Sequence, residues 1–319
     1  MNPLAEIRTG ARLHFGLFDT RSSSGRQGGI GMMIDRPGWH LRASVSEVDE
    51  IIGPPEIQTR IGRTLDRLQP ARTESGAVRI EVLAAISAHR GLGSGTQLAL
   101  AISRLLRELS LLESTAESTL DRGRRSLVGT LGFAQGGFVI DPGAQPLLSN
   151  PRPRCLPVPE AWRLILIEPT DAATCSGEIE SQAFERLPPM TRAIRSRLAT
   201  LVENDIEPAI SQQHFPRFAA GVSEFNQIVG EQFAPSQGGI YAHRCIRELA
   251  EVLAETQWPY LAQSSWGAAA ALFCEKGDSA DRLEEFVART LDDPAIRITR
   301  ARPQNHAAEV RGGEGERGG

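Results

Sequence analysis

The sequence predicts a soluble protein of the α+β class, built from two domains. Segments with the two-residue period of strands interleave with segments of helical spacing along the chain. Apolar residues make up 40% of the sequence and charged residues 23%, as in ordinary globular proteins. A chain of 319 residues is long enough for two domains. There is no signal-like N-terminus and no apolar run near 18 residues, so we expect a cytoplasmic location.

Charge and cysteine usage exclude several classes of protein. The net charge of −4 gives no general attraction to nucleic acid or to an anionic membrane, so small molecules are the expected partners. The four cysteines are widely spaced and form no C-x-x-C pair, which argues against a zinc site or a disulfide framework. Lys276 is the only lysine and sits in a turn-like segment, which disfavours a lysine-based mechanism.

The first predicted element is a strand within residues 5–19 that runs into a loop. Its apolar positions, Ile7, Leu13, Phe15 and Leu17, are interrupted by Arg12 and His14. Two interpretations of these polar residues are open. They could face solvent from an edge strand, or they could line a binding site.

The next segments alternate between the two periodicities. Residues 39–48 alternate apolar and polar side chains, which predicts a half-buried strand. Residues 57–68 have apolar side chains at helical spacing, residues 78–86 return to strand spacing, and residues 96–109 predict an amphipathic helix.

A glycine-rich loop, residues 89–97, connects the last of these strands to the helix and is the strongest functional signal. Gly91, Gly93 and Gly95 would let the backbone approach a phosphate closely, and Ser94 and Thr96 add hydroxyl groups. The start of a helix also presents unpaired N–H groups and a favourable dipole for an anion. The alternative is a plain glycine-rich turn. The loop matches neither the P-loop nor the dinucleotide-binding fingerprint.

A second motif, which is cationic, follows the helix. Arg122, Arg124 and Arg125 lie within four residues and precede Ser126 and a glycine-rich segment with little charge, residues 129–138. Such a run is usually a solvated surface, but clustered guanidinium groups beside a close-approaching backbone suit a multiply charged phosphate.

Six prolines between residues 141 and 159 indicate a connection, which places a domain boundary between residues 1–150 and 151–310. Beyond it we expect a buried strand at residues 162–167 and helices over 190–202, 215–229 and 243–253. The tail, residues 311–319, contains only glycine and charged residues. It has no apolar side chain to bury, so disorder is expected there.

A third motif, Ser264-Ser265-Trp266-Gly267, precedes a small-residue strand at residues 268–273. In one interpretation it is a turn, and the Trp266 side chain simply fills the core. In the other, the Trp266 ring offers a face to an aromatic substrate.

Four separated motifs carry a resemblance to a known family. Gly91–Leu98, Gly-Leu-Gly-Ser-Gly-Thr-Gln-Leu, resembles the phosphate loop of the GHMP kinase superfamily, in the variant of the β-ribofuranosylaminobenzene 5′-phosphate synthases. The segment 11–19, the block from Gly123 to Phe138 and the Ser-Ser-Trp-Gly motif are similar to the same family. The resemblance covers roughly residues 5–300. It implies a GHMP kinase-like fold with two α/β domains and a site in the cleft between them.

The resemblance also implies a reaction. In the methanopterin branch of one-carbon cofactor biosynthesis, this family condenses 5-phosphoribosyl 1-diphosphate with 4-aminobenzoate or 4-hydroxybenzoate and releases CO₂ and diphosphate. GHMP kinases generally place a catalytic aspartate in the part of the fold that corresponds to the block from Gly123 to Phe138. Here residues 133–135 are Phe-Ala-Gln, and the nearest acid is Asp141. An ATP-dependent small-molecule kinase and a non-catalytic sensor of phosphorylated metabolites are the alternatives.

The expected site follows from these motifs. Arg12, which could hold the benzoate carboxylate, is expected to be catalytic together with His14, Arg124 and Ser126. The phosphate-binding residues are expected to be Gly91, Gly93, Ser94, Gly95, Thr96, Arg122 and Arg125. The substrate-binding residues are expected to be Phe15, Asp19, Gln135, Ser264, Ser265 and Trp266. Mg²⁺ is expected on the diphosphate, with no protein ligands assigned, and no organic cofactor is expected. A homodimer is an option that the sequence leaves open.

Overall fold

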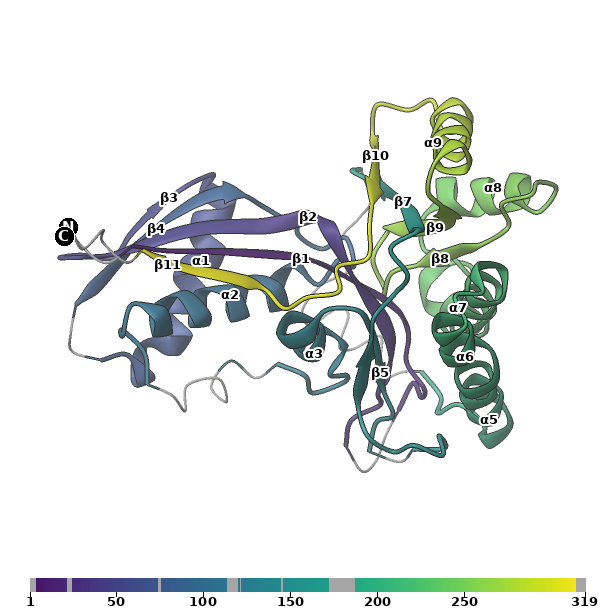
Figure 1. Cartoon of the computed structure of the whole chain (residues 1–319), viewed down its shortest axis with the longest axis horizontal. Helices are drawn as coiled ribbons and strands as arrows, with labels where there is room; N and C mark the ends of the chain where they lie inside the picture. Colours follow the sequence, from purple (N-terminus) through teal and green to yellow (C-terminus); the bar gives the residue numbers. More distant parts are fainter. Residues whose placement is uncertain are drawn as a thin grey trace.

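A computed structural model describes residues 4–21, 25–73, 76–113, 120, 122–144, 146–171 and 187–313 of the chain. In these residues a seven-stranded sheet, which extends from the left of the view, lies next to a four-stranded sheet on the right (Figure 1). The mixture of helices and sheets confirms the α+β class. None of the described helices is long and apolar enough to span a membrane.

The larger sheet contains strands from both ends of the chain. Its members are β1 (Leu4–Gly16), β2 (Gly29–Ser46), β3 (Glu50–Ile52), β4 (Ala77–Ala84), β5 (Phe138–Asp141), β6 (Arg154–Leu156) and β11 (Glu309–Gly313). The order is β11-β1-β2-β4-β3, and β5 joins β2 beside β4 and carries β6. All pairs are antiparallel except β3 and β4. The long strand β2 is the centre of this sheet.

The smaller sheet is antiparallel and has the order β10-β7-β9-β8. Its strands are β7 (Trp162–Pro169), β8 (Leu261–Gln263), β9 (Ala270–Glu275) and β10 (Ile296–Ala301). Successive residues of β7 join different apolar clusters: Leu164 and Leu166 face the main core, whereas Ile165 and Ile167 face a second cluster. This alternation follows from the two-residue period of a strand, and it shows that both faces of the sheet are covered.

Helices cover both sheets. The described helical segments are α1 (Pro55–Leu68), the 3₁₀ turn η1 (Gln69–Ala71), α2 (Ser94–Glu108), α3 (Val128–Gln135), α5 (Arg192–Thr200), the π-helical η3 (Leu201–Ile206), α6 (Glu207–Ser211), α7 (Phe215–Gln237), α8 (Arg244–Leu253) and α9 (Asp278–Thr290). Helix α2 packs on β1 and β2, and α7 packs on β1, β8 and β9. Helices α8 and α9 supply the second apolar cluster on the other face of the smaller sheet (Figure 1).

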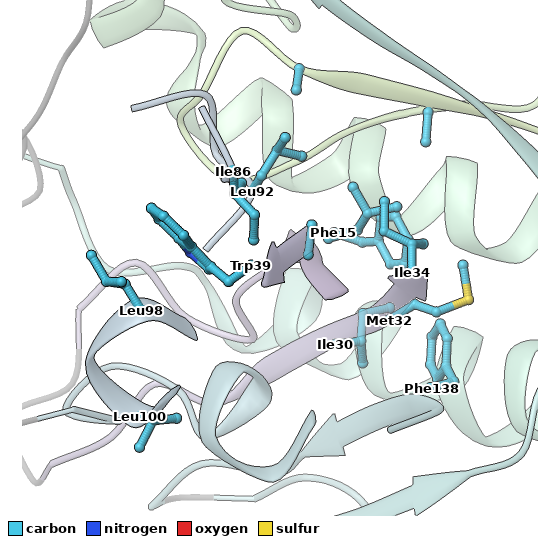
Figure 2. Packing of buried hydrophobic residues seen from close by; sticks show 14 of the residues in the cluster. Phe15, Ile30, Met32, Ile34, Trp39, Ile86, Leu92, Leu98, Leu100 and Phe138 are labelled. Carbon is cyan, nitrogen blue, oxygen red and sulfur yellow. The ribbon is translucent and has the colours of Figure 1, made fainter. Parts of the chain in front are cut away.

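One continuous core joins the two parts of the chain. Phe15 of β1 stacks near Phe138 of β5, with ring centroids 6.2 Å apart, and meets Phe273 of β9 edge-on at 5.6 Å. Phe218 of α7 contacts both Phe138 and Phe273. Figure 2 shows Phe15 and Phe138 among the buried side chains of β2, including Ile30, Met32 and Ile34. The two predicted domains therefore share an apolar core.

Most predicted elements occur where the periodicity placed them, and four differ. The helix expected over 215–229 is the longer α7, which ends at Gln237. The expected strand at 39–48 is the second half of the longer β2, which starts at Gly29. The proline-rich segment 141–159 is not all connection, because residues 154–156 form β6. The helix expected over 190–202 starts at Arg192 and continues through η3 and α6 to Ser211.

The expectation of disorder from residue 311 is wrong for residues 311–313. They belong to β11, where Arg311 pairs with Glu6 and Gly313 with Leu4 of β1. The backbone hydrogen bonds of an open sheet edge order these residues although their side chains have little to bury. Residues 314–319 lie outside the described part of the chain. Because β11 returns to the first sheet, the C-terminal segment completes the N-terminal half.

Candidate active site

A pocket of about 510 Å³ lies where β1, the start of α2, the loop before α3, and α7 meet. One wall is polar and cationic: Arg12, His14, Thr96, Arg122, Arg124, Arg125 and Ser126. The other wall is mainly apolar: Phe15, Leu17, Val229, Phe233, Ile240 and Trp266. The pocket thus brings together ten of the residues that the sequence singled out.

Arg12 and His14 reach the pocket from the end of β1. The backbone N–H of Arg12 donates to the carbonyl oxygen of Leu92 at 3.0 Å, and its Nη1 donates to the carbonyl oxygen of Gly91 at 3.3 Å. These bonds fasten β1 to the glycine-rich loop. His14 is only 7% exposed, so the solvent-facing interpretation is wrong for this residue.

The environment of His14 keeps its imidazole neutral. Burial lowers the pKa of His14 well below 6.5, and the nearby Arg12 guanidinium lowers it further. The backbone of His14 is held from both sides, since its N–H donates to Ser264 Oγ at 3.0 Å and its carbonyl accepts from Ser265 N–H at 2.7 Å. His14 therefore offers the pocket an uncharged ring on a backbone that is held from both sides.

The glycine-rich loop starts a helix, as predicted, but only part of it faces the pocket. Gly93 caps α2 with a φ of 69°, and the Cβ of any larger residue at Gly91 would lie 2.0 Å from the carbonyl oxygen of Ser264. Both positions thus require glycine. Thr96 lines the pocket, whereas Gly91, Gly93, Ser94 and Gly95 are not among the lining residues.

The hydroxyl of Ser94 has structural partners. It donates to the carbonyl oxygen of Ile86 at 2.9 Å and accepts from Arg60 Nη2 at 2.6 Å. Ser94 is 5% exposed, so its side chain supports the loop from behind. The Arg60 guanidinium lies over the Trp39 ring, 5.2 Å from the centroid, which completes this support.

The loop that carries Arg122, Arg124 and Arg125, here called the arginine loop, is anchored by the buried acid Asp141. Its carboxylate accepts from Arg26 Nε at 3.0 Å and from the Leu127 N–H at 2.6 Å. The carbonyl oxygen of Arg125 accepts from the Gly28 N–H at 2.9 Å. Ser126 Oγ accepts from the Val128 N–H at 3.2 Å, at the start of α3. Asp141 is fully buried and does not line the pocket, so it positions the loop and is not placed as a base.

The residues of the Ser-Ser-Trp motif have two different roles: one supports the glycine-rich loop, and the other two line the pocket. Ser264 is fully buried, and its hydroxyl donates to the carbonyl oxygen of Gly91 at 2.7 Å, so it joins β1 to the loop and does not line the pocket. Ser265 and Trp266 do line the pocket. The Trp266 ring meets Phe233 at 5.2 Å with an interplanar angle of 63°, which makes a two-ring aromatic wall. Trp266 is only partly buried, so it both packs on the core and faces the pocket.

Two predicted substrate-binding residues lie elsewhere. Asp19 accepts from the Met190 N–H at 3.1 Å and forms an ion pair with Arg195 Nε at 3.3 Å. Its carboxylate thus holds the segment before α5. Gln135 is exposed at the end of α3. Neither residue is part of the pocket lining.

The contribution of α7 was missed by sequence reasoning. Asn226, Val229, Phe233 and Gln237 lie on one face of this helix, at spacings of three or four residues, and line the pocket. Asn226 Nδ2 donates to the carbonyl oxygens of Phe15, at 2.7 Å, and of Gln263, at 2.9 Å. The only sequence signal was the helical spacing itself, which equally describes a helix face packed in the core.

No aspartate or glutamate is found among the described residues that line the pocket. No group of three or more histidine, cysteine, aspartate or glutamate side chains in the described ranges could hold a metal ion. Asp121, next to the arginine loop, lies outside the described residues. The described lining therefore offers guanidinium groups, hydroxyls and one neutral imidazole, but neither a kinase-type base nor a carboxylate ligand for Mg²⁺.

Comparison with curated proteins finds synthases. The chain is 27% identical over 241 residues to the β-ribofuranosylphenol 5′-phosphate synthase of Archaeoglobus fulgidus, covering 70% of this chain and 76% of that protein. It is 28% identical over 246 residues to the enzyme of the same name from Methanothermobacter thermautotrophicus, covering 68% and 74%. No protein-family model matches. These relatives confirm the resemblance to the synthase family that the sequence motifs indicate.

Comparison with solved structures confirms the GHMP kinase-like fold. The homoserine kinase of Cytophaga hutchinsonii superposes with a TM-score of 0.68, at 14% identity and 97% coverage of both chains. The mevalonate kinase of Methanococcus jannaschii gives a TM-score of 0.60 at 12% identity, covering 94% of this chain and 98% of that one. At such identities the likeness shows the fold alone.

Proposed function

We propose that this chain is a synthase that condenses 5-phosphoribosyl 1-diphosphate with a para-substituted benzoate to a C-riboside, releasing CO₂ and diphosphate. The observation that carries the proposal is a single pocket lined both by the arginines of the cationic wall and by the aromatic and aliphatic side chains of the apolar wall. The two walls match the two substrates, one a polyanion and the other an aromatic acid. The names of the curated relatives contain a ribosylated phenol, which favours 4-hydroxybenzoate, with 4-aminobenzoate as the related substrate.

The cationic wall suits the phosphoribosyl diphosphate. Arg122, Arg124 and Arg125 lie on a loop that Asp141 and Gly28 hold in place, so their backbone positions are set before the substrate arrives. Preorganised cations stabilise the negative charge that develops as diphosphate leaves. Thr96 lies in the first turn of α2, where the helix dipole also favours an anion.

The reaction needs no protein nucleophile. The ring carbon that bears the carboxylate forms a bond to C1 of the ribose, while the bond from that C1 to the diphosphate oxygen breaks and its electron pair leaves with diphosphate. The bond between the ring and the carboxylate then breaks, its electrons restore the aromatic ring, and neutral CO₂ departs. No proton has to be removed from either substrate in these steps. Arg12, at the end of β1, is proposed to hold the carboxylate until that bond breaks.

The neutral His14 fits this chemistry, because no general base has to take a proton from a substrate hydroxyl. A buried uncharged imidazole beside Arg12 can accept or donate one hydrogen bond without adding charge. Mg²⁺ is proposed to enter with the diphosphate as part of the substrate, since the described lining offers it no carboxylate. A cytoplasmic location and a homodimer stay predictions.

The test is a product balance. The protein is incubated with Mg²⁺, phosphoribosyl diphosphate and carboxyl-labelled 4-hydroxybenzoate or 4-aminobenzoate, and labelled CO₂ and diphosphate are counted. We expect equal amounts of the two products with at least one benzoate. Diphosphate without CO₂ would indicate hydrolysis or attack through the para substituent and would contradict the proposal.

The kinase alternative is measured in parallel by ADP formation from ATP with a panel of small alcohols. Turnover of ATP at a rate comparable to CO₂ release would favour a kinase. Tight binding of phosphoribosyl diphosphate without any turnover would favour a sensor.

A further inference from the structure

Gln237 is a pocket residue with an unusually well-defined side-chain amide. It is the last residue of α7, one and two helical turns beyond the pocket residues Phe233 and Val229. Gly238 caps the helix in the left-handed conformation with a φ of 80°, so the chain turns back over the Gln237 side chain. Gln237 thus lines the pocket from the same helix as the aromatic residue Phe233.

The orientation of the amide follows from its partners. Its Nε2 donates to the carbonyl oxygen of Gly239 at 3.0 Å and to that of Ile240 at 2.7 Å. Two carbonyl oxygens can be satisfied only by the NH₂ group, so the opposite assignment of the amide is excluded. Both N–H bonds of Gln237 are thereby used, and its Oε1 is a fixed acceptor.

The Gln237 Oε1 atom can accept one more hydrogen bond. In the described part of the chain its one donor is Gln263 Nε2 at 3.4 Å, a long contact, and Gln263 Nε2 has a closer acceptor in the carbonyl oxygen of Ser265 at 3.0 Å. Gln263 is itself fixed, because its Oε1 accepts from the Ala242 N–H at 2.6 Å. A carbonyl oxygen can accept two hydrogen bonds, so Gln237 Oε1 can accept one from a ligand.

We propose that Gln237 Oε1 accepts a hydrogen bond from the para substituent of the aromatic substrate, and that Gln237 selects benzoates whose para group carries a hydrogen. The inference rests on the proposed function. A para hydroxyl or amino group satisfies the acceptor, whereas a para ether leaves it unpaired. The substrate class is thus narrowed to benzoates with a hydrogen-donating para group.

The bond also acts on the rate, for an electronic reason. When the carboxyl-bearing carbon attacks ribose, positive charge spreads through the ring to the para carbon, and the para oxygen or nitrogen takes up part of it. The hydrogen on that atom then becomes a stronger donor, so its bond to Gln237 is stronger in the transition state than in the bound substrate. Such an interaction raises kcat more than it lowers KM.

The test compares kcat/KM for 4-hydroxybenzoate and 4-methoxybenzoate in the wild type and in Gln237→Met. Both substrates donate electrons by resonance, but only the hydroxyl donates a hydrogen bond. Methionine keeps length and helix propensity and removes the acceptor. We expect the preference for the hydroxyl compound to fall by about tenfold in Gln237→Met, mainly through kcat. Gln232→Met, on the same helix but not among the described lining residues, should keep the wild-type ratio.

A purely structural role of Gln237 in ending α7 would lower activity on both substrates equally, and an unchanged ratio overturns the inference. Thermal unfolding of Gln237→Met measures that structural contribution separately. If the wild type turns over neither these two benzoates nor 4-aminobenzoate, the proposed function fails and the inference falls with it. If it turns over both with equal kcat/KM, only the inference fails.

Discussion

The two walls of the pocket recognise ligand by different physical means. The cationic wall consists of side chains from β1, α2 and the loop before α3, all in the first 130 residues. It attracts an anionic ligand electrostatically. The apolar wall comes from α7 and the segment after it, from the Ser265–Trp266 turn and from the end of β1, and it acts through area, shape and ring geometry. Electrostatic attraction reaches roughly 10 Å in moderate salt, whereas ring packing requires contact. We therefore expect the first wall to govern phosphoribosyl diphosphate and the second to govern the benzoate.

The largest expected effect is on the cationic wall. In Arg124→Gln with Arg125→Gln, two charge-assisted interactions are lost, each worth about 1.5–3 kcal/mol. We expect kcat/KM for phosphoribosyl diphosphate to fall by about 10²–10⁴, measured by diphosphate release. Arg63→Gln with Arg67→Gln, two exposed residues of α1, is the matched control and should be nearly neutral. Equal losses in both double variants would show that net charge alone matters.

Arg12 belongs to the cationic wall but is proposed to hold the benzoate carboxylate, so it tests how far the two walls divide the two substrates. Arg12→Gln removes one charge-assisted pair, so the KM of the benzoate should rise by about one to two orders of magnitude while that of phosphoribosyl diphosphate hardly moves. Arg8→Gln, on the exposed part of β1, serves as the control. A rise confined to the phosphoribosyl diphosphate KM would instead assign Arg12 to the phosphate.

The aromatic wall should show a smaller effect of the opposite selectivity. Trp266→Leu removes one ring of the Trp266–Phe233 pair, and a ring contact is worth about 0.5–1.5 kcal/mol beyond its area. The benzoate KM should rise by about threefold to tenfold, with the phosphoribosyl diphosphate KM unchanged. Trp258→Leu, whose ring packs on Phe286 and does not line the pocket, is the control. If Trp266→Leu affects both substrates alike, the walls are not separable.

The smallest effect concerns the pH dependence of stability through His14. Because burial lowers its pKa in the folded chain, the unfolded chain binds a proton at His14 as pH falls below about 6.5 and the folded chain does not. Stability is thus lost as pH falls through this range, by up to about 1.4 kcal/mol per pH unit for one proton. Urea unfolding between pH 5 and 8 should show this slope in the wild type and a shallower one in His14→Gln. Parallel slopes would mean that His14 is protonated in the folded protein.

The sequence by itself determined the α+β class, the helix that follows the glycine-rich loop, and the resemblance to the synthase family. These depend on local spacing: the period of apolar residues along a strand or helix, and glycine at Gly91 and Gly93, where only glycine fits. It also identified the cationic wall almost completely, because Arg122, Arg124, Arg125 and Thr96 stand in two compact motifs.

Only the tertiary structure decided which polar residues face the pocket and which support it. Ser264 meets His14 across 250 residues of sequence, and Asn226 meets Phe15 across 211, and no local period encodes such contacts. For that reason the sequence suggested Ser264, Ser94 and Asp19 as binding residues, whereas in the structure their side chains make hydrogen bonds that hold the fold together. Gln237 gave no signal beyond its helical spacing, because its role depends on the helix ending there and on the carbonyl groups that then hold its amide. Side-chain chemistry is written in the sequence, but the direction in which a side chain points is set by partners that only folding brings near.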